Sequence, residues 1–474
     1  FRVVLLKFRE KPKLFMFLIN FSKIKWYNNY GRWIMYKNNK VFILGMARSG
    51  YEVAKILLKR DNKVVITDAK EQKEEHVNEL KELGAQVIIT SEPEKFLNDT
   101  FDYVVKNPGI TYEHKCILKA DELEIPVVNE MEVAYNLLPK DVKIIGITGS
   151  NGKTTTATLT YELIKETNNK VHLGGNIGIP FCAMLDKINK GDIVVLEISA
   201  QQLHDFKNFK PNIGVITNLT ETHLDFFKTY DNYVNHKLMI FDNSKEEDIV
   251  IINMADKETV GDIKPRKIYF SSNLKGNSYI EKDAIYYDGE LIINLNDIRV
   301  KGNHNYENIM CAIIAAKEFG VTNSMIKEVL NKFSGVEHRL EYVKKLNNRE
   351  FYNDSKSTNV VSTKVALSSF SKPVILLLGG LDRGHSFEEL GDSLTHVKGI
   401  AAFGETKNRI KEFADSLGID CVVVEKLSEA VKVAYTLSDE GDVILLSPAC
   451  ASWDQYPDFE SRGRDFKEAV EKLI

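Results

Sequence analysis

Cysteine is scarce in this sequence, and the few cysteines form no recognisable motif. Five are spread over 474 residues, and no C-x-x-C spacing occurs. An odd number of distant cysteines argues against a disulfide framework and against a cysteine-based zinc site. We therefore expect free thiols and a cytoplasmic protein. The cysteines are Cys116, Cys182, Cys311, Cys421 and Cys450.

Long hydrophobic runs and a strong excess of one charge are also missing. The apolar run LFMFLIN near the amino terminus is too short to span a bilayer. A formal net charge of -4, with 43% hydrophobic and 27% charged residues, is that of an ordinary globular protein. We expect neither a membrane span nor a nucleic-acid partner, so any partner must bind at a specific site.

The first 36 residues differ from the rest of the chain. They contain eight lysines and arginines against one acidic residue, Glu10, and they show no hydrophobic period. A small-residue cleavage site typical of a signal peptide is missing as well. Position 1 is not methionine, and Met35 stands just before the first convincing strand. We interpret residues 1–36 as a basic leader outside the fold. A basic arm that contacts a membrane surface is the alternative.

The remaining sequence predicts three α/β domains. Its length suits about three domains of ordinary size. From Lys40 onward, apolar strand-like runs alternate with longer helical patterns, which is typical of largely parallel sheets. Three such sets predict facing domains at residues 37–131, 132–335 and 336–474. Ligands are expected at the carboxyl ends of the strands.

The first set opens with KVFILGMARSGYEVAKILLKRDNKVVITDAK. This stretch is similar to the dinucleotide fingerprint G-x-G-x-x-G with a later acid, here Asp68, but Ala47 replaces the middle glycine. Three interpretations stay open: a nicotinamide dinucleotide, a nucleotide-sugar with its phosphates on the helix N-terminus, or a tight turn without ligand.

The second set opens with GITGSNGKTTT, which nearly matches a phosphate-binding loop. Its glycines stand at 146, 149 and 152. A buried strand precedes the loop and a threonine-rich helix start follows, as phosphate binding requires. Gly149 and Gly152 would let the backbone approach the phosphates, Lys153 would reach the β and γ oxygens, and Thr154 would offer its hydroxyl to Mg²⁺. A glycine turn with an incidental lysine is the less favoured alternative.

Three further residues follow strands or lie in a helix of the second set. Glu197 ends the buried strand of IVVLEISAQQL, where a second Mg²⁺ ligand is expected. His223 follows another buried strand, and Lys237 lies fourteen residues later. By themselves, these two are as well explained by a structural histidine and a solvated lysine. A lysine ammonium has no acceptor with which to bind a cation.

The order of motifs resembles the Mur ligases from about residue 38 to the end. The matching motifs are GITGSNGKTTT, GGNIGIP, LEISAQQL, NLTETHLDFF, KGNHNYENIMCAIIAA, GVEHRLE, NDSKSTN, LLLGGLDRG and LLSPACASWDQYPDFESRGRDF. The phosphate loop alone would indicate only the wider superfamily. GGLDRG and SPACASWDQ point to the D-glutamate-adding member. The D-N-P-R run typical of members that add lysine or diaminopimelate is absent.

This resemblance implies both the architecture and the reaction. The N-terminal domain would be a Rossmann-like nucleotide-sugar domain, the central one a P-loop ATPase-like domain, and the C-terminal one Rossmann-like and amino-acid-binding. ATP would drive ligation of D-glutamate to UDP-N-acetylmuramoyl-L-alanine (UDP-MurNAc-L-Ala) in peptidoglycan precursor synthesis, through an acyl phosphate and a tetrahedral intermediate. Such chemistry requires charge neutralisation rather than a nucleophilic side chain. Accordingly, no Ser-His-Asp or Cys-His arrangement is found. We expect a monomer, because no coiled-coil pattern occurs.

The resemblance also implies a residue set for ATP and for two Mg²⁺ ions. The metal ligands would be Thr154, Glu197, His223 and Lys237, the last carbamylated by CO₂ and thus an anionic oxygen ligand. Lys153, Glu197, His223 and Lys237 would form the catalytic group. The implied ATP-binding residues are Gly149, Asn151, Gly152, Lys153, Thr154, Thr155, Asn305, Asn308, Arg339 and Asp354.

Two more residue sets would hold the other substrates. The UDP-sugar residues are Arg48, Ser49, Asp68, Lys70, Asn176, Ser199 and Gln202. The D-glutamate residues are Lys356, Thr358, Arg383, Ser452 and Phe459. The alternatives are a sister ligase or folylpolyglutamate synthetase, a nicotinamide dehydrogenase, and a non-enzymatic nucleotide-sugar binder. The last would predict loss of the catalytic group, whose four residues are all present.

Overall fold

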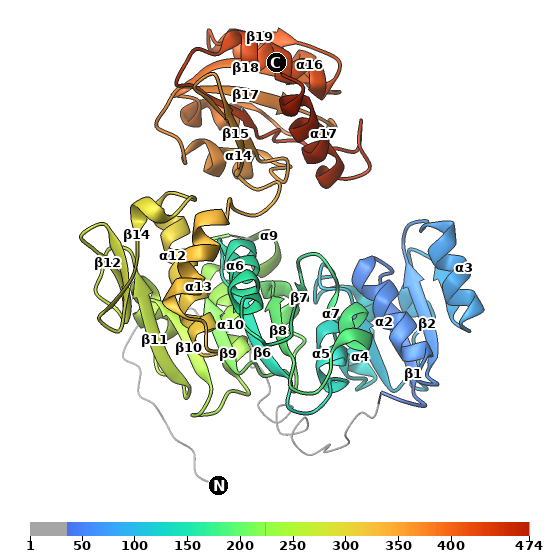
Figure 1. Cartoon of the computed structure of the whole chain (residues 1–474). Helices are drawn as coiled ribbons and strands as arrows, with labels where there is room; N and C mark the ends of the chain where they lie inside the picture. The colour runs from blue at the N-terminus through green and yellow to red at the C-terminus, as the bar shows by residue number, and fades with distance from the viewer. Residues whose placement is uncertain (1–35, 223, 474) are drawn as a thin grey trace, which may run out of the picture.

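A β-sheet with helices packed against it forms the centre of each of three domains (Figure 1). The computed structural model describes residues 36–222 and 224–473. Near-continuous apolar strands such as IVVLE and VILLLG are wholly buried, as expected where helices cover both faces of a parallel sheet. The expected α/β fold with three domains is confirmed.

The N-terminal domain is a five-stranded parallel sheet in the order β3-β2-β1-β4-β5. Its strands β1 and β4 are neighbours, so the turn after β1 and the loop after β4 meet at one edge. The elements are β1 (Lys40–Leu44), α2 (Arg48–Leu58), β2 (Lys63–Asp68), α3 (Glu74–Glu82), β3 (Gln86–Ile89), η1 (Pro93–Lys95), β4 (Tyr103–Lys106), α4 (Lys115–Glu122), β5 (Val127–Val128) and α5 (Glu130–Asn136).

The central domain contains a nine-stranded sheet in the order β14-β13-β12-β11-β10-β9-β6-β8-β7. Strand β6 lies between β9 and β8, so the loops after all three strands share one edge. The strands are β6 (Lys143–Thr148), β7 (Val171–Gly175), β8 (Ile193–Glu197), β9 (Ile213–Ile216), β10 (Ile249–Asn253), β11 (Arg266–Ser271), β12 (Ser278–Glu281), β13 (Ala284–Tyr287) and β14 (Glu290–Asn294).

Helices cover the central sheet, and α12 is buried on nearly all sides. Its sequence NHNYENIMCAIIAAK carries apolar residues around the whole helix, which is the pattern of a buried helix. It packs against α6 and thereby approaches the phosphate loop. The helices are α6 (Lys153–Lys165), α7 (Phe181–Met184), η2 (Leu185–Lys187), α8 (Ala200–Leu203), α9 (Leu224–Phe227), α10 (Tyr230–Leu238), η3 (Met239–Phe241), η4 (Met254–Asp256), α11 (Lys257–Val260), η5 (Leu295–Asp297), α12 (Asn303–Lys317) and α13 (Asn323–Lys332).

The C-terminal domain has a six-stranded sheet in the order β15-β16-β20-β17-β18-β19. All its neighbouring strands are parallel except β15 and β16. The elements are β15 (Glu341–Leu346), β16 (Arg349–Asn353), α14 (Val360–Leu367), β17 (Val374–Gly379), η6 (Glu388–Ser393), β18 (Val397–Phe403), α15 (Lys407–Ser416), β19 (Asp420–Val423), α16 (Leu427–Leu437), β20 (Val443–Leu446) and α17 (Phe459–Glu471).

Antiparallel hairpins extend two of the sheets, which the alternation of strands and helices did not predict. Strands β12, β13 and β14 form an antiparallel meander, and β15 pairs with β16. The turn residues Asp288 and Gly289 both have positive φ, at 48° and 82°, and Asn347 and Asn348 lie at 46° and 59°. Such turns match the twist of a two-stranded hairpin and favour Asp, Asn and Gly. The local signal was therefore present in the sequence.

The N-terminal and central domains share one hydrophobic core. Buried residues of both, including Val41 and Met131 on one side and Phe181 and Phe209 on the other, belong to a single cluster. The apolar clusters of the C-terminal domain contain only its own residues. Figure 1 accordingly shows the C-terminal domain above the other two, joined to the central domain by the segment after α13. The first two domains form one packed body.

Tyr36, the last residue of the expected leader, belongs to the N-terminal domain. Residues 1–35 lie outside the described residues. Tyr36 is 4% exposed, and its ring packs edge-to-face on Tyr103 with centroids 5.4 Å apart. Asn62 donates from Nδ2 to the Tyr36 carbonyl at 2.9 Å. The assignment of Tyr36 to a segment outside the fold was therefore wrong, because its ring completes the N-terminal core. Within the described residues, no helix is both long and apolar enough to cross a membrane.

Candidate active site

The loop between β6 and α6 is shaped by glycines that admit no side chain. Gly149 and Gly152 have φ of 141° and 80°. A Cβ on Gly149 would lie 1.9 Å from Thr217 Oγ1, and one on Gly152 would lie 2.0 Å from Asn308 Oδ1. Both positions therefore require glycine for backbone shape and for close packing. The loop leads directly into α6, whose N-terminal N–H groups and dipole favour an anion.

Lys153, the first residue of α6, folds back over this loop. Its Nζ donates to the carbonyl oxygens of Gly149 and Ser150, both at 2.8 Å. Removal from water lowers the pKa of Lys153 to about 8; Glu197 opposes this shift, and the cations Arg339 and Lys356 add to it. An anion bound at the loop would favour the charged form. Lys153 can therefore donate to a bound phosphate group instead of to these two carbonyl oxygens.

Thr154 and Glu197 form a buried pair of oxygen groups beside the loop. Thr154 Oγ1 donates to Glu197 Oε2 at 2.7 Å, and Asn176 Nδ2 donates to Glu197 Oε1 at 2.9 Å. Glu197 is at the carboxyl end of β8, next to β6 in the sheet, which explains the meeting of residues 43 positions apart. A hydroxyl and a carboxylate are the ligands that Mg²⁺ prefers. The pair fits the expected cation site.

Lys237 is buried next to the same loop. Lys237 is 1% exposed, and its Nζ donates to the Gly149 carbonyl at 2.8 Å and to Thr148 Oγ1 at 3.3 Å. Burial lowers the pKa of Lys237 well below its usual value, and the neighbouring Lys153 lowers it further. The Glu197 carboxylate tends to raise the pKa of Lys237. The expected partner His223 lies outside the described residues.

The adenine-side residues begin α12, and Asn308 is adjacent to the loop. Thr156 Oγ1 donates to Asn308 Oδ1 at 3.4 Å, and Asn308 is buried. Asn305 is half-buried and donates from Nδ2 to the Lys301 carbonyl at 2.9 Å. Asn308 therefore reaches the phosphate loop, whereas the Asn305 side chain bonds within the start of the helix.

Arg339 carries a direct contact between the C-terminal segment and the phosphate loop. Its Nη1 donates to Thr154 Oγ1 at 3.4 Å. Asp354 is 2% exposed and near enough for the Arg339 charge to act on its carboxyl group. Its carboxylate accepts hydrogen bonds from Ser447 Oγ at 2.7 Å and from the Leu340 N–H at 3.2 Å. Burial raises the pKa of Asp354 to about 6, and Ser357 and Ser447 oppose the shift by donating hydrogen bonds to the carboxylate.

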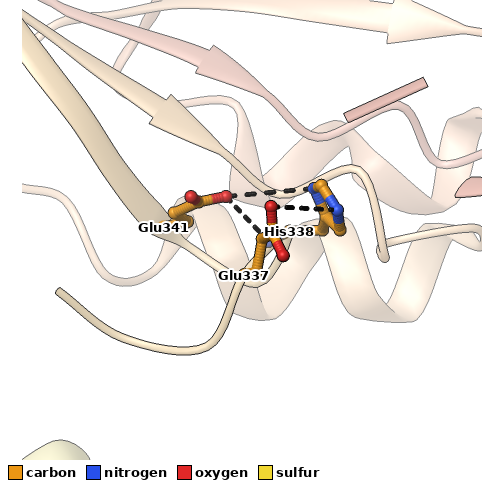
Figure 2. Close-up of side chains that lie close together, drawn as sticks. All are labelled: Glu337, His338 and Glu341. Atoms are coloured by element: carbon orange, nitrogen blue, oxygen red, sulfur yellow. Dashed lines mark hydrogen bonds and ion pairs between the residues drawn. The ribbon is translucent and has the colours of Figure 1, made fainter. Parts of the chain in front are cut away.

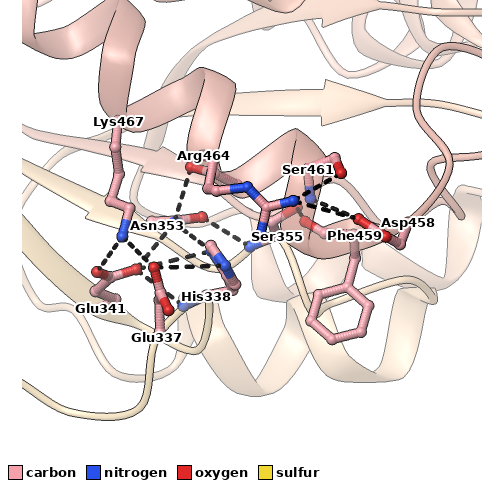
Figure 3. A network of polar contacts seen from close by, with 11 residues as sticks. Glu337, His338, Glu341, Asn353, Ser355, Asp458, Phe459, Ser461, Arg464 and Lys467 are labelled. Atoms are coloured by element: carbon pink, nitrogen blue, oxygen red, sulfur yellow. Dashed lines mark hydrogen bonds and ion pairs between the residues drawn. The ribbon is translucent and has the colours of Figure 1, made fainter. Parts of the chain in front are cut away.

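Glu337, His338 and Glu341 form a polar cluster (Figure 2). They lie on both sides of Arg339 in the sequence. Three such ligand atoms close together would suit a metal ion. However, Lys467 Nζ contacts Glu337 Oε1 at 2.5 Å and Glu341 Oε1 at 3.0 Å, so a cation already occupies this position (Figure 3). The cluster is therefore explained as a set of ion pairs within the protein.

This cluster fixes an unfavourable backbone around Arg339. His338 and Leu340 have φ of 65° and 44°, a left-handed conformation that costs a non-glycine residue about 1 kcal/mol or more. Asn353 Nδ2 donates to His338 Nδ1 at 2.9 Å, and the His338 N–H donates to Glu341 Oε2 at 2.9 Å. Burial also lowers the pKa of His338, which agrees with a neutral ring that accepts a hydrogen bond. The contacts hold Arg339 in the turn.

A cavity of about 700 Å³ runs from the first turn of α2 to Lys153 and Lys237. It thus connects the N-terminal domain with the phosphate loop. Both domains contribute to its wall, which combines backbone turns, amides and few charged groups. The lining residues are Ala47, Arg48, Ser49, Asn107, Pro108, Gly109, Glu130, Lys153, Gly175, Asn176, Pro180, Ser199, Ala200, Gln201, Gln202, Phe226, Tyr233 and Lys237.

Most of the expected UDP-sugar residues line this cavity. Arg48 and Ser49 do, as do Asn176, Ser199 and Gln202. Asp68 and Lys70 do not. Asp68 instead accepts hydrogen bonds from the Met46 N–H at 2.8 Å and the Lys70 N–H at 2.9 Å, and so supports the turn from outside. Contact of Asp68 and Lys70 with a ligand stays a prediction.

None of the expected D-glutamate residues lines the cavity. Lys356 is near enough for its charge to lower the pKa of Lys153, and its Nζ lies 5.8 Å from the centre of the Phe459 ring. Arg383 stacks on the exposed ring of Trp453 at 4.7 Å, and Ser452 is buried beside it. Thr358 donates its N–H to the Lys356 carbonyl at 2.9 Å. Their role stays a prediction.

The loop after β4 also forms part of the cavity wall, which the sequence motifs did not predict. Asn107, Pro108 and Gly109 line it, together with Tyr233, one helical turn before Lys237. A signal was present: the buried strand YVVK runs into a Pro-Gly turn at the carboxyl end of a parallel sheet. The sequence does not show that β4 pairs with β1, so it does not place this turn beside the turn after β1.

Three family models match the chain in order. The Mur ligase MurD-like N-terminal domain matches residues 39–129, the Mur ligase middle domain matches 147–316, and the Mur ligase glutamate ligase domain matches 338–450. The chain is 43% identical over 446 residues to the UDP-N-acetylmuramoylalanine–D-glutamate ligase of Geobacillus kaustophilus strain HTA426, covering 92% of this chain and 98% of that protein. The ligase of the same name from Bacillus mycoides strain KBAB4 is 43% identical, with 93% and 99% covered.

Solved structures agree with this assignment at the level of the fold. The UDP-N-acetylmuramate-alanine ligase MurC of Thermotoga maritima superposes with a TM-score of 0.56 at 21% identity, covering 92% of this chain and all of that one. MurF ligase of Thermotoga maritima in complex with ADP gives a TM-score of 0.55 at 16% identity, covering 92% and 96%. The resemblance in the sequence motifs is confirmed, and the chain belongs to the Mur ligase family, in which the two curated relatives named above are D-glutamate ligases.

Proposed function

We propose that this chain ligates D-glutamate to UDP-MurNAc-L-Ala at the expense of ATP. The observation that carries the proposal is the cavity joining the N-terminal turn to Lys153. A nucleotide-sugar held at Arg48 and Ser49 would extend its acyl arm past Asn176 toward the phosphate loop. The names of the curated relatives supply the two substrates.

The proposed reaction has two steps, a phosphoryl transfer to the substrate carboxylate and an acyl transfer to the amine. A carboxylate oxygen of the alanyl group attacks the γ-phosphorus of ATP, and ADP leaves. The amine of D-glutamate then attacks the acyl phosphate, and the tetrahedral intermediate expels phosphate as the amide forms and the amine loses a proton. Lys153 and the N–H groups of α6 stabilise the phosphate charge. Arg339 lies within reach of Thr154 and adds a second cation.

Oxygen ligands for Mg²⁺ are available beside the loop. The hydroxyl of Thr154 and the carboxylate of Glu197 lie 2.7 Å apart and are both buried. Bound there, Mg²⁺ would neutralise charge on the transferring phosphoryl group. His223 and Lys237 complete the proposed set for two ions. In its amine form, Lys237 offers no suitable oxygen, so it fits this role only as a carbamate.

The surroundings of Lys237 favour that carbamate. Its burial and the nearby Lys153 favour the neutral amine, which is the form that attacks CO₂. Addition forms a nitrogen–carbon bond, releases one proton and leaves an anionic carboxylate. Both Nζ atoms donate a hydrogen bond to the Gly149 carbonyl. A charged Lys237 would repel Lys153 there, whereas a carbamate would attract it. A hard anionic oxygen ligand results.

Phosphate release that depends on the amino acid tests the proposed substrates. With UDP-MurNAc-L-Ala and ATP, we expect D-glutamate to give sustained release of phosphate, and L-glutamate or L-lysine to give only the background seen without amino acid. The control omits the nucleotide-sugar, because its carboxylate must be phosphorylated before D-glutamate can react. Release with L-lysine instead of D-glutamate would assign the chain to a sister activity.

The C-terminal domain is expected to close on the other two when substrates bind. The apolar clusters of this domain contain no residues of the other two domains. Arg339 and Lys356 approach the phosphate loop, but the expected D-glutamate residues do not line the cavity. Small-angle X-ray scattering should therefore show a smaller radius of gyration with UDP-MurNAc-L-Ala and a non-hydrolysable ATP analogue together. UDP-MurNAc-L-Ala alone, which binds the packed pair of domains, should change little. Identical profiles in all states would contradict closure.

A further inference from the structure

A buried ion pair joins the N-terminal domain to the central domain beside the cavity. Lys106 Nζ lies 3.0 Å from Asp205 Oδ2, and the two side chains are 0% and 3% exposed. Lys106 ends β4, and Asp205 follows α8. Among the described residues, Asp205 Oδ2 has no hydrogen-bond partner, and the Lys106 ammonium is the cation that faces this oxygen. The other oxygen, Oδ1, lies 3.3 Å from His204 Nδ1.

Lys106 also holds the loop that follows it. Its Nζ donates to the carbonyl oxygens of Ile110 at 3.0 Å and of Asn107 at 3.5 Å. The intervening residues 107–109 form part of the cavity wall. A single ammonium thus ties both ends of a substrate-facing loop to a carboxylate of the other domain.

Aromatic rings cover the pair on the side of α10. The Lys106 ammonium lies 4.9 Å from the centre of the Tyr112 ring, which packs against the His204 ring at a tilt of 35° with the centroids 3.7 Å apart. His204 in turn stacks on His236, at 5.1 Å, immediately before Lys237. These rings exclude water from the pair, and a charge pair out of water is screened very little by salt.

We propose that Lys106 and Asp205 are positioning residues for the nucleotide-sugar, because they set the loop of residues 107–110 against the central domain. The inference rests on the proposed function, since it assigns the cavity to the UDP-linked substrate. The phosphate loop is held by separate contacts, from Thr217 and Asn218. Loss of the pair should therefore weaken nucleotide-sugar binding much more than ATP binding.

Calorimetric titration of the full-length protein tests this difference. For Lys106→Met, we expect the Kd for UDP-MurNAc-L-Ala to rise about tenfold or more, because small displacements of a binding loop are costly. The Kd for ATP should change by less than about twofold. The matched control is Lys59→Met, which removes another ion pair between the same domains. Lys59 and Asp186 are 3.4 Å apart but 52% and 73% exposed, so we expect both Kd values to stay unchanged.

A second variant covers the possibility that Lys106→Met does not fold. The double variant Lys106→Met/Asp205→Leu leaves no unpaired buried charge and is expected to fold. It should show the same weakened nucleotide-sugar binding, with faster amide hydrogen exchange in residues 107–110 and unchanged exchange in the phosphate loop. A folded double variant that binds UDP-MurNAc-L-Ala as tightly as wild type would overturn the inference. Failure of the wild-type protein to bind UDP-MurNAc-L-Ala would instead refute the proposed function.

Discussion

Lys153→Met is expected to lower kcat about a thousandfold, the range found when a cation that stabilises a transferring phosphoryl group is removed. The Lys153 ammonium sits on the phosphate loop between the carbonyls of Gly149 and Ser150. Methionine preserves the length of the side chain but has no charge. The fold should remain, because the variant removes a partly desolvated cation. Steady-state kinetics and thermal melting measure the two effects.

Lys165→Met is the matched control for this variant. Lys165 lies at the other end of the same helix and pairs with Glu162 at 3.2 Å on the surface, so its loss should leave kcat unchanged. Full activity of Lys153→Met would contradict the assigned role of Lys153.

The pKa of Lys153 also predicts how the KM for ATP depends on pH. With a pKa of about 8 in the free protein, Lys153 is charged below pH 8 and neutral above it. Bound phosphate favours the ammonium, so binding above pH 8 must take up a proton. The KM for ATP should be flat below pH 8 and rise about tenfold per pH unit above it. Lys153→Met should lose this rise, and a wild-type KM that stays flat to pH 10 would refute the link.

Lys237→Ala is expected to reduce activity about a thousandfold, because it removes both the proposed carbamate ligand and its charge. Formate or acetate added to this variant should restore part of the activity, since a small carboxylate can occupy the space that the side chain leaves. Lys237→Arg should not be rescued, because its guanidinium still fills the site with positive charge. Activity against carboxylate concentration is the measurement.

Two observations separate a carbamate from a purely structural lysine. Lys245→Ala removes an exposed lysine of the same domain, paired with Glu247 at 3.8 Å, and should change nothing. Depletion of CO₂ should lower wild-type activity, and added bicarbonate should restore it. If carboxylates left Lys237→Ala inactive and CO₂ depletion had no effect on wild type, the carbamate proposal would be wrong.

Local sequence was sufficient for the features that depend on neighbouring residues. The strand, glycine turn and helix around Lys153 were predicted correctly, because glycine at 149 and 152 and the apolar runs act within a few residues of each other. The position of Glu197 at the end of a buried strand followed in the same way. The hairpin turns at Asp288 and Asn347 depend equally on local sequence, because Asp, Asn and Gly favour positive φ.

The sequence by itself determined the three α/β units, the phosphate loop and the family motifs, because these depend on residue type and short spacing. Only the tertiary structure decided that residues 107–109 face the same cavity as Arg48 and Lys153. Strand order brings β4 next to β1, and the packing of two domains on one core brings Lys106 to Asp205, 99 positions away. Such long-range neighbours are chosen by the burial of apolar surface over whole sheets and domains, and no short segment of the chain records them.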